Sequence, residues 1–245
     1  MSTNLVLISG VLSKHTLRYT PKGTPLLEIS LIGKRAVGEN HLFSRADFTF
    51  YGKLAEHWAN QLVDGQAYQA MGRLVYESWE ADGVKGSRLR LVGEELFKLE
   101  NADVRQEEKG PVLYGAENRV ILSGGLTADP EIRQTSLKTP VARASLGFSS
   151  WDASAGQARS HYIELEAWRD LAVQFADLKK GSQVLLEGSL KTEVWEDKET
   201  KTRRYKRVLE VERVTPLARI RSAERDPEEP QVWGSTKAKT QTKAA

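Results

Sequence analysis

An internal repeat limits the possible folds of this 245-residue chain more than any other sequence feature. Residues 4–10 (NLVLISG) are matched by residues 118–124 (NRVILSG), and residues 51–55 (YGKLA) are matched by residues 168–172 (WRDLA). Two glycines and a tryptophan recur in the same order, as Gly65, Gly72 and Trp79 and then as Gly181, Gly188 and Trp195. This long period predicts a duplicated domain of about 100 residues, not a solenoid of short units.

The repeat divides the chain into two domains, a connection and a tail. We expect the domains to span residues 1–100 and 118–217. Residues 101–117 (NADVRQEEKGPVLYGAE) are highly charged and contain a proline and two glycines, a composition typical of a linker. Residues 218–245 are polar, so they bury too little apolar surface to offset the entropy of ordering. We therefore predict that this tail is disordered.

Within each repeat, five apolar segments have the pattern of β-strands, and a helix is expected between the third and fourth. The helix is indicated by apolar residues four apart: Leu54, Trp58 and Leu62 in the first repeat, and Leu171, Phe175 and Leu178 in the second. Five strands with a helix in this place are typical of the OB-fold, a small closed Greek-key barrel. The sequence thus predicts an all-β chain of tandem OB-folds with one short helix in each domain.

Several classes of protein are disfavoured by what the sequence lacks. It contains no cysteine, which excludes disulfides and thiolate metal sites and fits a reducing, cytoplasmic setting. No apolar run reaches the ~18 residues that a membrane helix needs. The glycine motifs of nucleotide-binding loops and the GxSxG elbow are absent, and the four histidines lack the spacing of metal ligands. We expect no catalytic residue, no metal and no cofactor.

The net charge of +3 hides how the charges are distributed. Residues 1–100 hold 12 basic and 11 acidic residues, and residues 118–217 hold 16 and 14. Neither domain is strongly basic, so any binding of a polyanion depends on local groups of cations.

One such group follows a tryptophan at the same position of each repeat. Trp79 precedes a predicted hairpin with Lys85, Arg88 and Arg90. Trp195 precedes a longer basic run in the second repeat: Lys198, Lys201, Arg203, Arg204, Lys206 and Arg207. Single-stranded nucleic acid needs flat apolar surfaces for its bases and cations for its phosphates. The pattern therefore favours binding of single strands, although the tryptophans alone also fit caps of the barrel core and the basic runs alone also fit solvated hairpins.

Further aromatic residues extend this candidate surface. Tyr51 and Trp168 end the third predicted strand of their repeats, where they either stack on bases or pack beneath the helix. Trp151 and Tyr162 flank a polar hairpin expected to project from the second barrel. The full set of candidate binding residues is Tyr51, Arg73, Trp79, Lys85, Arg88, Arg90, Trp151, Tyr162, Trp168, Trp195, Lys198, Lys201, Arg203, Arg204 and Lys206.

Four segments of the sequence resemble motifs of the bacterial single-stranded DNA-binding protein family. They are residues 17–23 (LRYTPKG), 51–56 (YGKLAE), the segment from Gly72 to Trp79, and residues 161–172 (HYIELEAWRDLA). Two copies in one chain resemble the Deinococcus–Thermus type of the family. The resemblance implies nonspecific binding of single-stranded DNA in replication, recombination and repair, at the nucleoid, by a homodimer with four OB-folds.

The resemblance also assigns roles to individual positions. Trp79 and Trp195 occupy the position of the family's stacking tryptophan after strand four, and Tyr51 and Trp168 that of its strand-three aromatic. Tyr162 falls near another family aromatic, whereas the matching position in the first repeat is Arg45.

The chain departs from the family pattern at two places. The loop RYTxxG of the first repeat becomes RQTSLK at 133–138, so the two copies are expected to bind unequally. The last residues, TKAA at 242–245, lack the family's acidic tip, which leaves open how replication and repair proteins would be recruited. An OB-fold scaffold of a repair or phage complex, with weak or no DNA binding, is the alternative, and an RNA-directed protein is a third.

Overall fold

The computed structural model describes residues 2–81, 84–152, 156–196 and 203–218. The first repeat contains five strands and one helix, and they follow one another along the chain in the predicted order. These elements are β1 (Asn4–Tyr19), β2 (Pro25–Val37), β3 (Asn40–Tyr51), α1 (Gly52–Ala59), β4 (Ala67–Ala81) and β5 (Val84–Lys98). The strands extend beyond the apolar segments that predicted them, because their ends continue as two-stranded hairpins outside the barrel.

The second repeat has the same order, with its first strand divided into two. Its elements are β8 (Asn118–Leu126), β9 (Glu131–Gln134), β10 (Pro140–Asp152), β11 (Gln157–Trp168), α2 (Asp170–Phe175), β12 (Gln183–Glu196) and β13 (Arg203–Pro216). The interruption between β8 and β9 contains Pro130, which has no N–H to continue a ladder. The first repeat continues through the corresponding region with only a register shift between Leu12 and Lys14.

Both barrels close in the same way. In the first, β1 pairs with β2 and β4, and β3 pairs in parallel with β5. In the second, β8 pairs with β10 and β12, and β11 pairs in parallel with β13. The barrel interiors are filled by fully buried side chains such as Phe48, Phe50 and Leu186, and Phe175, the last residue of α2, is buried in the same core cluster. The prediction of tandem OB-folds is therefore confirmed.

Asn4 and Asn118 occupy equivalent positions of the two repeats and make equivalent contacts. The Asn4 side-chain amide donates to the Leu74 carbonyl at 2.8 Å and accepts the Leu74 N–H at 2.9 Å. Asn118 makes the same two contacts with Leu190, both at 2.9 Å. Each asparagine thus bonds to the strand-four backbone in its own barrel, where an apolar side chain would leave two polar groups unpaired.

The segment 101–117, which we expect to link the two repeats, contains an ordered hairpin. It contains β6 (Val104–Glu107) and β7 (Gly110–Tyr114), and β7 pairs in parallel with β2, with Leu113 opposite Gly33. Leu113 and Ala116 are almost fully buried and pack in a small cluster with Val11 and Ala67. The composition of the segment gave no sign of these buried apolar positions.

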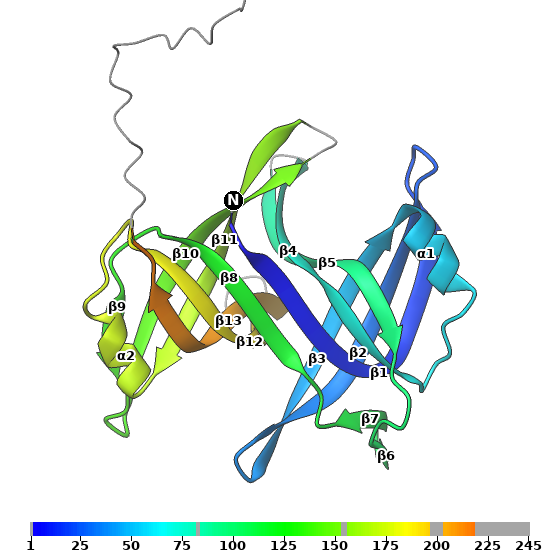
Figure 1. The fold of residues 1–245 in the computed structure, drawn as a ribbon, viewed down its shortest axis with the longest axis horizontal. Coiled ribbons are helices and arrows are strands. Elements are labelled where there is room, and N and C mark those ends of the chain that lie inside the picture. The colour runs from blue at the N-terminus through cyan, green and yellow to red at the C-terminus, as the bar shows by residue number, and fades with distance from the viewer. Residues whose placement is uncertain (1, 82–83, 153–155, 197–202, 219–245) are drawn as a thin grey trace, which may run out of the picture.

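The two barrels are joined directly as well as through this hairpin. β1 pairs with β8 in antiparallel register, from Asn4 opposite Leu122 to Ile8 opposite Asn118. One continuous sheet therefore runs through both repeats, and Figure 1 shows β1 and β8 side by side at its centre. No described helix is long and apolar enough to cross a membrane. The predicted disordered tail lies, from residue 219 onward, outside the described residues.

Candidate nucleic-acid interface

Tyr51 is held in place at the end of β3 by an arginine from the neighbouring hairpin. The Tyr51 side chain is 37% exposed, and the Arg90 guanidinium lies 5.9 Å from the centre of its ring. Arg90 donates to Glu77 Oε1 at 2.9 Å and to Thr49 Oγ1 at 2.8 Å. Its side chain is only 14% exposed. Arg90 therefore supports the aromatic ring from within the protein surface and is not a free surface cation.

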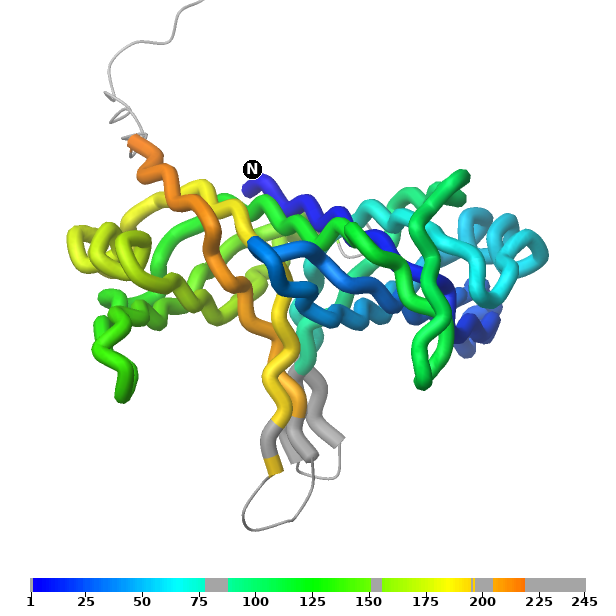
Figure 2. The backbone as a smooth tube through the Cα atoms, turned by 90° about the horizontal axis from the view of Figure 1, so that it is seen from below, coloured from blue at the N-terminus to red at the C-terminus, as the bar shows by residue number. Residues whose placement is uncertain are grey.

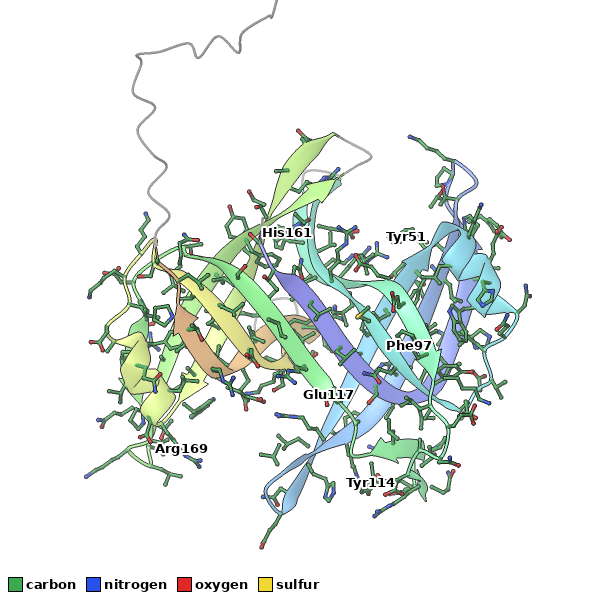
Figure 3. All side chains as sticks on the ribbon, viewed as in Figure 1. Tyr51, Phe97, Tyr114, Glu117, His161 and Arg169 are labelled. Carbon is green, nitrogen blue, oxygen red and sulfur yellow. The ribbon has the colours of Figure 1, made fainter. Side chains whose placement is uncertain are left out.

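Trp168 ends β11 at the equivalent position and is held by a different network. Its indole N–H donates to Glu166 Oε2 at 3.2 Å. Glu166 is buried, and it also accepts from Arg143 Nη2 at 3.3 Å and from Lys191 Nζ at 3.2 Å. A buried carboxylate is tolerated only with such partners, so the three donors and the acid form one unit. Figure 3 shows Arg169, the residue after Trp168, at the lower end of the second barrel and Tyr51 in the upper part of the first.

The other described cations of the candidate set lie in ion pairs. Arg73 Nε is 3.2 Å from Glu94, Arg88 Nε is 3.0 Å from Glu77, and Lys206 pairs with Glu164. Ion pairs at exposed sites contribute about 0–1 kcal/mol. A phosphate group can therefore compete for these partly exposed cations at small cost.

The structure gives only backbone positions for several other candidates. Trp79 and Trp195 lie on β4 and β12, opposite Gly86 and Arg204 in the ladders with β5 and β13. Lys85, Trp151, Arg203 and Arg204 likewise have strand positions without described side chains. Lys198 and Lys201 fall outside the described residues.

Tyr162 contributes to a contact between the repeats. Its ring is 49% exposed and meets Tyr76 of β4 edge-to-face, with 6.1 Å between ring centres. The preceding His161 is buried, and its Nδ1 accepts the backbone N–H of Tyr76 at 2.9 Å. Its Nε2 lies 2.6 Å from Ser150 Oγ. Burial, followed by the charges of Arg73 and Arg159, lowers the pKa of His161.

A groove of about 1360 Å³ opens between the repeats next to this contact. Strands of both repeats line it, and Figure 2 shows the hairpins β4–β5 and β12–β13 projecting from the same side of the molecule. Further contacts across the repeats join Arg207 Nη1 to the Leu89 carbonyl at 2.7 Å and Arg35 Nη1 to Glu212 at 2.6 Å. The sequence did not indicate this groove, because contacts between repeats leave no periodic pattern.

Two supporting acids were also missed. Glu77 and Glu166 were not among the candidates, since isolated acids on strands resemble ordinary surface charge. The only available signal was their position, because each lies on a strand that carries a candidate aromatic residue. Among the described residues, no group of three or more histidine or acidic side chains is arranged to hold a metal ion.

Two OB-folds in one sheet, with partly exposed aromatic rings beside cations, define a tandem OB-fold protein with a surface suited to single strands. The single-strand binding protein family matches residues 3–99 and 117–217. The single-stranded DNA-binding protein of Thermus thermophilus is 34% identical over 219 residues, which cover 85% of this chain and 82% of the relative. That of Deinococcus radiodurans is 34% identical over 231 residues, covering 88% and 76%.

A solved structure gives the same result. The crystal structure of the wild-type single-stranded DNA binding protein from Thermus aquaticus superposes with a TM-score of 0.71 at 30% identity, covering 89% of this chain and 94% of that one. The chain belongs to the single-strand binding protein family. The resemblance inferred from the motifs is confirmed.

Proposed function

We propose that this protein binds and protects single-stranded DNA without strong sequence preference during replication, recombination and repair. The observation that carries the proposal is the pair of aromatic residues, Tyr51 and Trp168, at the equivalent end of strand three in each repeat, each held by its own polar network. The names of the relatives support DNA as the ligand. The scaffold alternative, with weak or no DNA binding, is therefore not favoured.

In this proposal, bases stack on aromatic rings while neighbouring cations contact the phosphates. Stacking contributes about 1–3 kcal/mol per base and tolerates any sequence, because every base has a π-face. Arg73, Arg88 and Lys206 exchange their carboxylate partners for phosphates, and the basic hairpin residues whose side chains are not described add to this contact. Each neutralised phosphate releases ~0.7 counterions, so affinity falls steeply with salt.

A fluorescence titration with oligo-dT at two salt concentrations tests the proposal. We expect quenching of tryptophan fluorescence and affinity that decreases with salt. Replacing Trp79 and Trp195 together by Ala is expected to weaken binding by about 2–6 kcal/mol, if each stacks on one base. Absence of any salt-dependent binding at low ionic strength would overturn the proposal, and competition with oligo-rU separates DNA from RNA as the preferred ligand.

We also propose that the protein forms a homodimer with four OB-folds. The outward face of the continuous sheet carries partly exposed apolar side chains on neighbouring strands, with Leu7 opposite Met71 and Leu5 opposite Ile121. Phe97 lies on the same face and is 48% exposed. Such a face supports association with a second copy of the chain, since an exposed apolar patch is stabilised when a partner removes it from water. Sedimentation equilibrium is expected to give twice the chain mass of 27.4 kDa, and a monomer at micromolar concentration contradicts this assembly.

A further inference from the structure

The groove between the repeats contains aromatic residues that neither third-strand site explains. Phe43, near the tip of the β2–β3 hairpin, is 60% exposed, and Tyr205, on β13, is 65% exposed. Both line the groove, together with the half-exposed Tyr162. Three large rings from two repeats thus lie around one hollow, and each presents surface that folding leaves uncovered.

The charge of the groove differs from that of the chain as a whole. Six basic and three acidic side chains line it, whereas the complete chain has a nearly balanced charge. Two of the acids are already paired within the groove, since Asp47 lies 3.3 Å from Arg45 and Glu164 contacts Lys206. Three more of the cations, Arg35, Arg88 and Lys191, pair with acids that lie outside the lining, namely Glu212, Glu77 and Glu166. Basic side chains therefore outnumber acids in the lining itself, and a polyanion would bind there by exchanging with these carboxylate partners.

Arg207 is the cation in this lining that most lacks a counterion. It donates to the Leu89 carbonyl, and no carboxylate among the described residues forms an ion pair with it. Burial is the main cause that lowers its pKa; Asp47 opposes this shift and Arg88 adds to it. A guanidinium in this environment gains from a nearby anion, because a charge removed from water is stabilised by a partner.

We propose that this groove holds the part of a single-stranded DNA that crosses from one repeat to the other, with Phe43 and Tyr205 stacking on bases and Arg207 contacting a phosphate. The inference rests on the proposed function and adds a third binding region to the two strand-three sites. Exposed rings and cations in one groove match the needs of a single strand. The hairpins β4–β5 and β12–β13 project from the same side of the molecule, so a strand leaving either one can reach the groove between their bases (Figure 2).

The test compares two lengths of oligo-dT on the full chain and on the variant Phe43→Ala/Tyr205→Ala. An oligomer of about 8 nucleotides fits within one OB-fold, whereas one of about 30 nucleotides reaches both. Because both side chains are largely exposed, the variant is expected to keep its melting temperature. Val173→Ala is the matched control, since Val173 is 58% exposed on α2 and does not line the groove.

We expect the double variant to lose affinity for the long oligomer by at least about 25-fold, because each stacked base is worth about 5-fold or more. The short oligomer is expected to lose much less, and the control variant is expected to bind both like the parent. Photocrosslinking of a long oligomer that carries iododeoxyuridine is expected to label the segments containing Phe43 or Tyr205.

Three results would overturn the inference while leaving single-stranded DNA binding intact. They are unchanged affinity for the long oligomer, an equal loss for both lengths, or crosslinks confined to segments outside the groove. If the parent protein binds neither oligomer, the proposed function itself fails.

Discussion

The aromatic sites at the ends of β3 and β11 occupy equivalent positions but are supported by opposite designs. The Arg90 guanidinium lies over the Tyr51 ring, and it reaches from β5 to the neutral Thr49 and to Glu77 on β4. In the second repeat, the position two residues before the aromatic is the buried Glu166, and here the carboxylate holds the ring. The first site is organised around a cation and the second around an anion. After duplication, the position of the aromatic ring has therefore been kept more closely than the means of holding it.

This difference affects which charges remain for DNA. In the second repeat, Glu166 accepts from both Arg143 and Lys191, whose side chains are 56% and 44% exposed. In the first, Glu77 is shared between Arg88, which is 57% exposed, and the nearly buried Arg90. Each site thus combines an aromatic ring with an acid that pairs with the neighbouring cations.

Among single substitutions at these two sites, the largest expected effect comes from removing the rings themselves. Trp168→Ala and Tyr51→Ala are each expected to weaken binding of oligo-dT by about 1–3 kcal/mol, with the larger loss at Trp168 because an indole offers more stacking surface. Fluorescence anisotropy with a labelled oligomer measures both losses under the same salt conditions. Val173→Ala serves as the control for a general effect of truncation. If only one of the two variants loses affinity, the two sites are not equivalent in binding.

A smaller effect is expected from removing the support of the first ring. Arg90→Ala is expected to lower the free energy of unfolding by about 1–2 kcal/mol, because a largely buried guanidinium loses two hydrogen bonds. Arg88→Ala provides the matched comparison, since Arg88 contacts the same Glu77 from a more exposed position and is expected to cost less than about 1 kcal/mol. Urea denaturation measures both. Equal losses would show that the buried hydrogen bonds of Arg90 contribute no more to stability than the exposed ion pair of Arg88.

The smallest effect concerns the hydrogen bond between His161 and the Tyr76 N–H. The first repeat has Ser44 at the position equivalent to His161, so the contact depends on the second repeat alone. Burial lowers the pKa of His161 below its usual value of 6.5, so the unfolded chain takes up a proton more readily than the folded one. Stability is therefore highest above pH 6.5 and decreases as the pH falls from there toward the lowered pKa. In the variant His161→Gln, the melting temperature is expected to depend less on pH across this range. The glutamine amide can still accept the Tyr76 N–H but does not titrate. An identical pH dependence in variant and parent would mean that His161 does not titrate in this way.

Much of the fold could be predicted because the repeat carries local information. The strand pattern, the interposed helix and the positions of Tyr51 and Trp168 follow from side-chain periodicity within a single barrel. Glu166 and the Arg90–Glu77 pair could not be predicted, because they depend on which residues of separate strands lie opposite one another. The hairpin at 104–114 was missed for a related reason. Its buried Leu113 lies in a segment rich in charged residues, so the composition of the segment does not reveal that part of it is buried.

The pairing of β1 with β8 gives the two repeats a fixed geometry, and this has a consequence for avidity. When two binding modules are tethered flexibly, the local concentration of the second site declines gradually as the tether lengthens. Here the backbone ladder from Asn4–Leu122 to Ile8–Asn118 replaces a tether, so the distance between modules does not fluctuate in that way. The affinity is then expected to rise in one step as the DNA is lengthened. Oligomers too short to reach the second module bind with the affinity of one module, and those just long enough to reach it bind with nearly the full affinity of both.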